Sequence, residues 1–510
     1  MNDAIVSDEL GVATASHEVR VALRNAVTLG LSLAVTLAVA FAVRFWMPRF
    51  LGPDAFGKLV FAEEFAAVFF VFVTLGTETY IRKEVAVRPE HASDFLGSLT
   101  VVRLGVSLLV AIIMGASLSW MGKSPIEWRL VYVFAAGQFF FVLNTSLGSV
   151  LQAVGKVRAL AWINAASKII WGAGIVTGLL LGYGLLVVAI LFLFTEALKA
   201  PFLLLTTRRL IGLRMTLNAQ ASWAIIVASL PYFLNFVAHR IYAKVDITLL
   251  SALTDDAEVG WYGAAANVTF LIYLILPVLN AVILPMGSRI AKESIEAMHE
   301  TMRSAVRAVL MVSVPVAILI TLNASAIVAL LFTSAFAPTV YVLQMIAPMV
   351  PLTYVCVLLS VHLIQVGRIW RVAGNSLIAL LLNPTLNLLL ITPAHKLLGD
   401  GGAGTAAAFS TVVTECVSAA LLLLALGPTA VDRKLVRLLW RLAVCCVVAA
   451  VAHHFLGRLG IYSIPIEVGI YIVVAGALGA LPLGDILRRV RSALARRGRS
   501  HSRISTGLNP

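Results

Sequence analysis

The sequence predicts an all-α polytopic membrane protein with about fourteen transmembrane helices, arranged as two parallel-repeat lobes of six helices followed by two C-terminal helices. Three observations support this prediction: the composition, the length of the apolar runs, and two pairs of repeated motifs. Of the 510 residues, 60% are hydrophobic and 13% are charged, whereas soluble chains have roughly 45–50% apolar and 25% charged residues. This composition excludes a chain of several soluble domains.

Apolar runs long enough to cross a bilayer recur along the whole chain. A hydrocarbon core of about 30 Å requires roughly 20 mostly apolar helical residues, because without water the backbone groups must bond within their own segment. In chain order the expected spans are Arg24–Trp46, Leu59–Tyr80, Leu96–Trp120, Trp128–Val150, Leu160–Leu181, Leu185–Thr206, Trp223–Leu253, Trp261–Pro285, Ser304–Phe332, Val340–Val366, Arg371–Ile391, Ala403–Leu426, Leu438–Leu456 and Tyr462–Leu483.

These spans predict the domain organisation. The expected parts are an N-terminal cytoplasmic segment (1–23), an N-lobe (24–210), a linker (211–222), a C-lobe (223–428), helices thirteen and fourteen (429–484) and a basic tail (485–510). No small-residue cleavage site follows a short apolar core, so the first span is expected to remain as an anchor. The prolines that interrupt spans predict kinks: Pro231, Pro277, Pro315, Pro348, Pro351 and Pro384.

The distribution of Lys and Arg predicts the orientation of the chain. The net charge is +14, with 39 Lys and Arg against 25 Asp and Glu, and most of the cations fall in alternate loops and in the C-terminal tail. Short loops rich in Lys and Arg face the cytoplasm, which places both termini there. The tail from Arg488 to Arg503 is expected to lie against anionic headgroups, so the positive charge does not require nucleic acid as a partner.

Two pairs of motifs indicate that the two groups of six spans are repeats. Leu151–Asn164 (LQAVGKVRALAWIN) matches Leu363–Asn375 (LIQVGRIWRVAGN), and Gly52–Ala62 (GPDAFGKLVFA) matches Asp255–Ala265 (DDAEVGWYGAA). The members of each pair are separated by about 200 residues, which is typical of a duplicated unit. Because six is even, both halves enter the membrane from the same side, and the repeat is expected to be parallel.

Four segments carry a resemblance to a known family. They are RFLGPDAFGKLVFA (Arg49–Ala62), LQAVGKVR (Leu151–Arg158), KVDITLLSALTDDAEVGWYGAA (Lys244–Ala265), and LNPTLNLLLI followed by GDGGAGTAAAFST (Leu382–Thr411). With them the sequence resembles the polysaccharide-transporter branch of the multidrug/oligosaccharidyl-lipid/polysaccharide (MOP) flippase superfamily, the Wzx-type O-antigen and exopolysaccharide flippases. The resemblance implies a MATE-like pair of lobes around a central cavity in the bacterial inner membrane. It also implies outward transport of a polyprenyl-pyrophosphate-linked sugar.

Cations inside the expected spans are candidates for binding such an anionic substrate. An ionisable group at bilayer depth costs at least about 2.5–3.5 kcal/mol, so it is expected to face a cavity or a partner. Arg240 and Lys244 are four residues apart, which places them on one face of a helix, and Arg and Lys together suit a diphosphate. For the residues near span ends, snorkelling to the headgroups is the alternative. The full candidate set is Arg24, Arg44, Arg103, Lys168, Arg240 and Lys244.

A second set of polar residues is a candidate site for a coupling cation, either Na⁺ or H⁺. Asn383 and Asn387 lie four residues apart beside Pro384, which frees a backbone carbonyl. With Asp246 they would offer oxygen ligands to a monovalent cation, although hydrogen bonding between helices is the more common role of such Asn residues. Glu415 is a candidate proton carrier.

Two other functions fit a polytopic membrane chain. An enzyme acting on lipid-linked sugars usually needs a large periplasmic loop or acidic catalytic pairs, and the expected outer loops are short. The cluster Asp255, Asp256 and Glu258 is the acidic candidate, and it is expected to be a solvated turn. No Walker motif is found, so direct coupling to ATP is not expected. The cysteines lack metal-ligand spacing, and neither a cofactor or metal site nor enzyme activity is expected. A drug antiporter of the same superfamily is the other alternative. The expected partners are the lipid-linked glycan, anionic lipids and a polysaccharide polymerase or export machinery.

Overall fold

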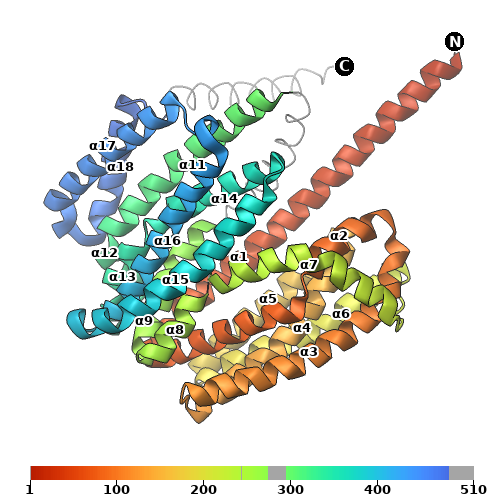
Figure 1. Cartoon of the computed structure of the whole chain (residues 1–510), viewed down its shortest axis with the longest axis horizontal. Coiled ribbons are helices and arrows are strands. Elements are labelled where there is room, and N and C mark those ends of the chain that lie inside the picture. Colours follow the sequence, from red (N-terminus) through yellow and green to blue (C-terminus); the bar gives the residue numbers. More distant parts are fainter. Residues whose placement is uncertain (1, 243, 274–293, 482–510) are drawn as a thin grey trace, which may run out of the picture. The chain divides into compact units, whose positions relative to one another are not determined.

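The computed structural model describes residues 2–242, 244–273 and 294–481, with the backbone alone for residues 2–31 (Figure 1). Within these ranges the chain forms helices and no strands. The α-helices are α1 (Asn2–Thr74), α2 (Thr77–Val87), α3 (Ala92–Trp120), α4 (Pro125–Ala153), α5 (Val157–Leu180), α6 (Leu185–Ile211), α7 (Ala219–Tyr242), α8 (Val245–Leu253), α9 (Asp256–Tyr273), α11 (Ile295–Leu322), α12 (Ala324–Leu331), α13 (Thr339–Ile346), α14 (Met349–Gln365), α15 (Ile369–Leu398), α16 (Gly402–Leu426), α17 (Arg433–Leu456) and α18 (Ser463–Ala477). Short 3-10 helices are η1 (Pro89–His91), η2 (Ser334–Phe336), η3 (Gly427–Ala430) and η4 (Gly457–Tyr462).

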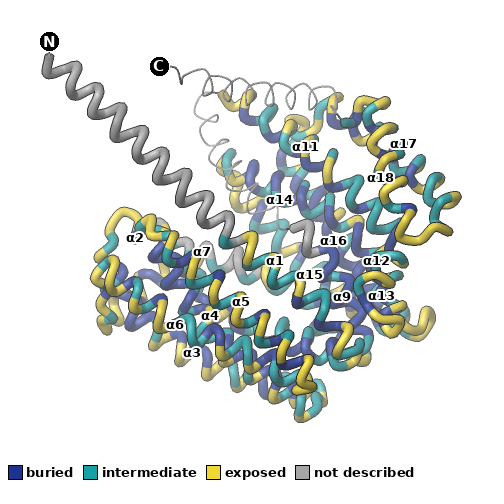
Figure 2. Tube along the Cα trace, turned by 180° about the vertical axis from the view of Figure 1, so that it is seen from behind, coloured by how far each residue is buried: buried dark blue, intermediate teal, exposed yellow. Residues whose placement is uncertain are grey.

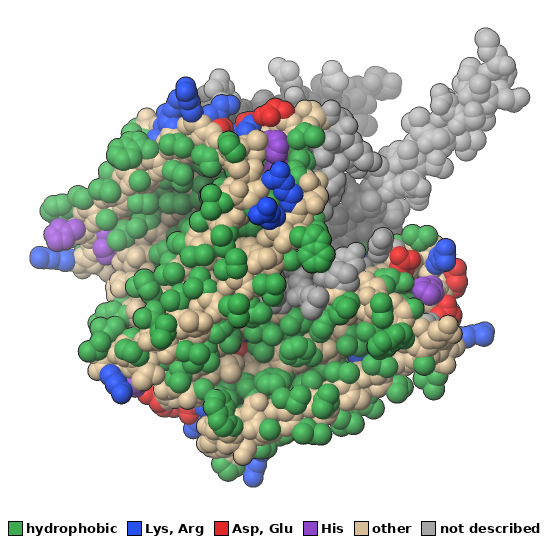
Figure 3. All heavy atoms as spheres, in the orientation of Figure 1, with side chains coloured by type: hydrophobic (Ala, Val, Ile, Leu, Met, Phe, Trp, Pro, Cys, Tyr) green, Lys and Arg blue, Asp and Glu red, His purple; other side chains and the backbone are tan. Residues whose placement is uncertain are grey.

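Nine helical stretches in the described ranges are long and apolar enough to cross a membrane. One of them, Arg433–Ala477, contains both α17 and α18. Figure 3 shows hydrophobic side chains over much of the visible face, with charged side chains gathered mostly toward its edges. These features confirm the predicted all-α polytopic membrane fold.

Helix α3 shows how these helices suit a lipid environment. Its exposed side, visible in Figure 2, carries large apolar side chains, while its other side is buried in the protein. Lipid tails are as apolar as these side chains, so their exposure there carries no penalty of the kind that water imposes. The exposed set includes Val101, Leu104, Leu108, Leu109 and Ile112.

Four of the expected spans are interrupted in the structure. The second span breaks after α1, where Leu75 and Gly76 have positive φ angles of 53° and 64°. The other breaks lie between α7 and α8, between α11 and α12, and between α13 and α14. Helix α1 also contains a non-helical residue, Gly52, with φ 72° and ψ 171°, so it consists of two helices joined at the point where the first two spans were expected to separate.

The chain divides into two compact units. The first contains Met1–Leu271, Leu331–Val342 and Ser376–Ser410, and the second contains Ile272–Leu330, Leu343–Asn375 and Thr411–Pro510. In the first unit α1 packs on α4 and α5, and α4 packs on α6. In the second unit α11 packs on α14 and α17, and α17 packs on α18. The boundaries of these units differ from those of the two expected six-helix lobes. The division into two lobes therefore stays a prediction.

Within the first unit, the matching motifs Gly52–Ala62 and Asp255–Ala265 lie against each other. A Cβ atom added to Gly57 would be 1.8 Å from the carbonyl oxygen of Asp256, and one added to Gly260 would be 2.2 Å from that of Pro53. When the motifs are aligned, Gly57 corresponds to Gly260 and Pro53 to Asp256. The two contacts are therefore reciprocal, as expected for equivalent surfaces related by a two-fold axis, and this reciprocity supports the duplication.

We expect Gly57→Ala to destabilise the protein. No side chain fits at 1.8 Å from a backbone oxygen, so α1 and α9 must separate, at a cost of about 1–3 kcal/mol that exceeds the gain in helix propensity. Thermal unfolding of the purified protein measures the effect. Gly105→Ala on α3 is the matched control, because nothing lies within 4 Å of its added Cβ atom. Equal unfolding temperatures for the two variants would contradict the close crossing.

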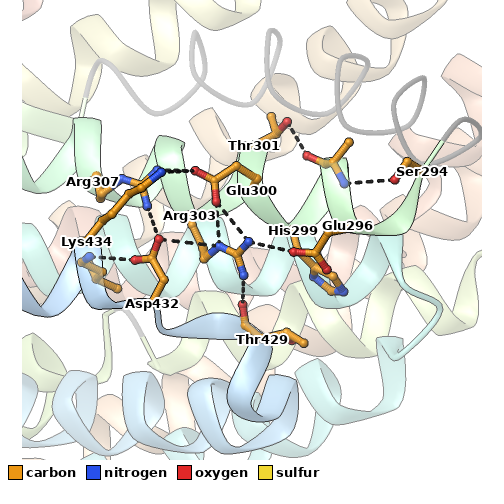
Figure 4. A network of polar contacts seen from close by, with 12 residues as sticks. Ser294, Glu296, His299, Glu300, Thr301, Arg303, Arg307, Thr429, Asp432 and Lys434 are labelled. Carbon is orange, nitrogen blue, oxygen red and sulfur yellow. Dashed lines mark hydrogen bonds and ion pairs between the residues drawn. The ribbon is translucent and has the colours of Figure 1, made fainter.

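In the second unit, a network of ion pairs joins the start of α11 to the start of α17 (Figure 4). Arg307 bonds to Glu300 and Asp432, each at 2.8 Å, and Arg303 bonds to Glu296 at 3.0 Å. Asp432 also caps α17 by accepting from the N–H of Leu435 at 2.7 Å. Burial acts to raise the pKa of the Asp432 carboxyl, but the Leu435 N–H and the Arg307 charge outweigh it and hold that pKa below its usual value.

Asp432→Asn is therefore expected to lower stability by about 1 kcal/mol at neutral pH, because Asn preserves the helix cap but removes the charge that faces Arg307. A depressed carboxyl pKa stabilises the fold above the unfolded value of about 4 and loses that effect as the pH falls through the folded value. The unfolding temperatures of wild type and variant should thus converge on acidification. Lys434→Gln, at a side chain that is 72% exposed, is the control. A difference that persists in acid would count against the Asp432 charge.

Candidate functional site

Arg44 on α1 lines a small pocket inside the first unit. Its Nη2 atom donates to Glu63 at 2.9 Å and its Nη1 atom donates to Asn267 at 3.2 Å. The pocket has a volume of about 30 Å³ and is also lined by Trp171 of α5 and Phe192 of α6. This space is large enough for one or two water molecules. A predicted cation, a carboxylate, an amide and an aromatic ring therefore converge at one point.

Lys244 forms the second ion pair of this region, with Glu64. Glu63 and Glu64 are adjacent on α1, so one short segment neutralises two cations from different elements. Arg240, at the exposed end of α7, also acts electrostatically on Glu64. Helix α7 ends at Tyr242, before Lys244. The expectation that Arg240 and Lys244 share one face of a continuous helix is therefore wrong, and what they share is proximity to Glu64.

Lys168 on α5 differs from the paired cations. Its Nζ atom lies 3.3 Å from the centroid of the Trp171 ring, a cation–π contact. In the described part of the chain it forms no ion pair with a carboxylate, whereas Lys199 on α6 is paired with Glu196 at 2.8 Å. Lys168 is thus a cation beside the pocket whose direct contact is a ring rather than a carboxylate.

Arg103 and Arg24 complete the predicted cations. Arg103 is buried and donates to Ser146 at 2.7 Å, to Thr77 at 2.8 Å and to the carbonyl of Thr74 at 3.0 Å. These acceptors include both sides of the break between α1 and α2, so its partners favour a structural role. Arg24 lies outside the residues whose side chains the structure describes.

Asp246, Asn383 and Asn387 are brought together, as the cation hypothesis requires. Asp246 lies in the first turn of α8. Its buried carboxylate accepts from the Tyr262 hydroxyl at 2.8 Å and from Asn387 Nδ2 at 2.7 Å. Asn387 Nδ2 also donates to Asn383 Oδ1 at 3.0 Å, and both Asn residues on α15 are fully buried. Asn387 Oδ1 is buried and accepts no hydrogen bond from the described residues. An oxygen-rich site of this kind suits a hard cation.

Glu415, the candidate proton carrier, lies on α16 in the second unit and is buried. Its backbone carbonyl accepts from the Cys356 thiol at 3.6 Å. It does not belong to the compact unit that holds Asp246. The role of Glu415 as a proton carrier stays a prediction.

Glu258 is a site residue that the sequence reasoning missed. It was expected in a solvated turn, but its side chain is fully buried and accepts from the N–H of Gly401 at 2.7 Å and of Gly404 at 2.9 Å. This expectation is wrong because unpaired N–H groups at the start of α16 attract a carboxylate. The glycine-rich segment at 399–404 is a typical anion-binding element. This sequence pattern is the signal that could have indicated a buried carboxylate partner.

Comparisons with known proteins agree with this architecture. A family model described as "Polysaccharide biosynthesis protein" matches residues 22–291, and one described as "MatE" matches residues 231–389. No curated protein matches the sequence significantly.

Among solved structures, the lipid II flippase MurJ in an inward closed conformation is similar, with a TM-score of 0.66 and 15% identity over 88% of this chain and 100% of that chain. An inward-facing multidrug resistance MATE family transporter of the MOP superfamily gives 0.60 and 16% identity over 76% and 97%. A mutant of the MATE transporter VcmN of Vibrio cholerae gives 0.51 and 13% identity over 80% and 99%. At these identities the similarity concerns the fold.

Proposed function

Because the chain belongs to the polysaccharide biosynthesis protein family and so to the MOP flippase superfamily, we propose that it flips a polyprenyl-pyrophosphate-linked oligosaccharide from the cytoplasmic to the periplasmic leaflet. The cargo is a repeat unit of O-antigen, capsule or exopolysaccharide, and transport proceeds by alternating access. The observation that carries this proposal is Lys168, an intramembrane cation beside the Arg44 pocket that forms no ion pair with a described carboxylate. An anionic substrate headgroup supplies the missing charge.

The paired cations support the same substrate class. Arg44 and Lys244 are held by Glu63 and Glu64, which limits the cost of keeping these charges within the membrane. A pyrophosphate offers several acceptor oxygens, and Arg and Lys bind such groups strongly. The pyrophosphate headgroup therefore replaces the Glu63 and Glu64 carboxylates as the partner of Arg44 and Lys244, while the polyprenyl tail stays in lipid.

The cluster of Asp246, Asn383 and Asn387 supplies the coupling-ion site in this proposal. One carboxylate and two amides provide oxygen ligands for Na⁺, or the carboxylate takes H⁺. Glu415 remains the candidate proton carrier of the second unit. The protein resides in the inner membrane with both termini in the cytoplasm, where its basic tail meets anionic lipids. A polysaccharide polymerase or export machinery receives the product.

A drug antiporter is the second candidate function, and the MatE match over residues 231–389 favours it. The Asp246 cluster lies within that range and would serve ion-coupled export of a cation equally well. The charge of Lys168, which forms no ion pair with a described carboxylate, argues against a cationic drug, because like charges repel. Enzyme activity is not proposed, since the proteins with similar folds are transporters.

Deletion in the native host tests the proposed function. Undecaprenyl-linked oligosaccharide should accumulate on the cytoplasmic side, and plasmid-borne wild type should restore export. Lys168→Met should fail to restore it, while Lys156→Gln, at an exposed loop position, should succeed. Normal polymerisation of the glycan in the deletion strain would refute the flippase. Increased drug sensitivity without lipid accumulation would support the antiporter instead.

A further inference from the structure

A buried carboxylate lies in the C-terminal helix pair, outside the sites described above. Glu467 on α18 is fully buried, within a stretch long and apolar enough to cross a membrane. It accepts from Asn323 Nδ2 at 2.7 Å and contacts His453 Nδ1 of α17 at 2.9 Å. Ser463, in the first turn of α18, donates to Asn323 Oδ1 at 3.3 Å. All four residues belong to the second unit.

Few charged groups surround this carboxylate. His453 faces it from α17, and Asn323, at the end of α11, is neutral. His454 on α17 and Arg458 on η4 are exposed, and one turn further along α18 the buried Tyr471 interacts with Cys445 and Cys446 of α17. In the described part of the chain, the titratable group in contact with Glu467 is therefore His453.

This arrangement favours the binding of one proton. With a neutral imidazole, the buried carboxylate keeps its hydrogen bonds but has no counter-charge beside it, which is energetically costly. One added proton converts the pair to an imidazolium and a carboxylate, or to an imidazole and a carboxylic acid, and in both forms the pair is neutral. The His453 side chain is 27% exposed, so the pair has a route to the surroundings.

We propose that His453 and Glu467 form a proton-binding site that takes its proton from the outer side of the membrane. In the predicted topology, α17 ends and α18 begins on that side. The site also holds the junction between α11 and α12, because Asn323 ends α11 and donates to Glu467. When the proton is lost, Asn323 at the junction is bonded to a Glu467 carboxylate whose negative charge has no counter-charge. Outer pH thereby controls how firmly the C-terminal helix pair is fastened to α11.

A double-mutant cycle at two pH values tests this site in the purified full-length protein. Thermal unfolding is followed for wild type, Glu467→Gln, His453→Gln and the double variant, at about pH 5.5 and about pH 8.5, on either side of the usual His range. Each side chain contributes to the proton-bound pair only when the other is present, and the proposed proton is bound in acid. The coupling between the two positions should therefore be larger in acid, by an unfolding-temperature shift on the order of 2 °C.

A purely structural hydrogen-bond network predicts a coupling that is the same at both pH values, and that result would overturn the proposal. His454→Gln, at the exposed neighbouring position, controls for the loss of any His and should keep the wild-type pH profile. If Glu467→Gln does not fold, the pH profiles of His453→Gln and His454→Gln decide, and identical profiles reject the site. No transported lipid is used, so the outcome is separate from that of the proposed flippase function.

Discussion

Asp246→Asn is expected to abolish the ion dependence of transport. Asn has the same shape as Asp and keeps one oxygen to accept from the Asn387 amide, while its NH2 group can donate to the Tyr262 hydroxyl oxygen, so the fold is expected to persist. The change removes the one carboxylate of the cluster, and affinity for the coupling cation should fall by about 10–100-fold or more, by analogy with weaker perturbations of metal sites. Flipping rates in proteoliposomes, measured against Na⁺ concentration and against pH, report this loss.

Tyr262→Phe is the matched control for that experiment. It removes one hydrogen bond to the carboxylate but leaves the charge, so the ion dependence should shift only modestly. Equal ion dependence of wild type and Asp246→Asn would exclude the cluster from coupling. A response to Na⁺ alone would identify the ion, because a proton site responds to pH.

Glu258→Ala is expected to cause the largest loss of stability. It leaves the N–H groups of Gly401 and Gly404 without their buried acceptor. Hydrogen bonds to charged groups contribute about 1.5–3 kcal/mol each, so the combined loss should be about 3–6 kcal/mol. Thermal unfolding measures it, and Glu258→Gln should lose less because one acceptor oxygen remains.

Asp255→Asn provides the comparison for Glu258, since the Asp255 side chain is 56% exposed. Its effect should stay within about 0.5 kcal/mol, as for most surface substitutions. If the two Glu258 variants unfold at the same temperature as Asp255→Asn, the carboxylate is not what holds the start of α16.

Much of the fold was predictable because its signals are local. Apolar runs and the loops between them predicted α3, α4, α5 and α6 almost at their observed positions. The breaks were harder to predict. Pro231, Pro315 and Pro384 lie inside continuous helices, whereas Leu75 and Gly76 interrupt the second span. In a membrane protein, neighbouring groups can satisfy the backbone that proline frees, so proline alone does not locate a break.

The predicted cations and Asn residues of the candidate site could be named from the sequence, but Glu258 and the pairings between side chains could not. Asn383 and Asn387 stand four residues apart in the sequence, so their common helical face is a local property. Their meeting with Asp246 depends on how α8 and α15 pack, which no local pattern encodes. The same holds for Arg103, whose acceptors come from α1, α2 and α4.

By itself the sequence determined the membrane class, the family and the set of charges that must be accommodated in the membrane, because hydropathy and motif spacing act over short stretches of chain. The tertiary structure alone decided which of those charges are neutralised. Arg44 forms an ion pair with Glu63, and Lys244 forms one with Glu64. Arg103 donates to neutral acceptors, and Lys168 makes a cation–π contact with Trp171. The physical reason is that an electrostatic interaction depends on distance in space, and residues far apart in the chain set that distance only when the helices pack.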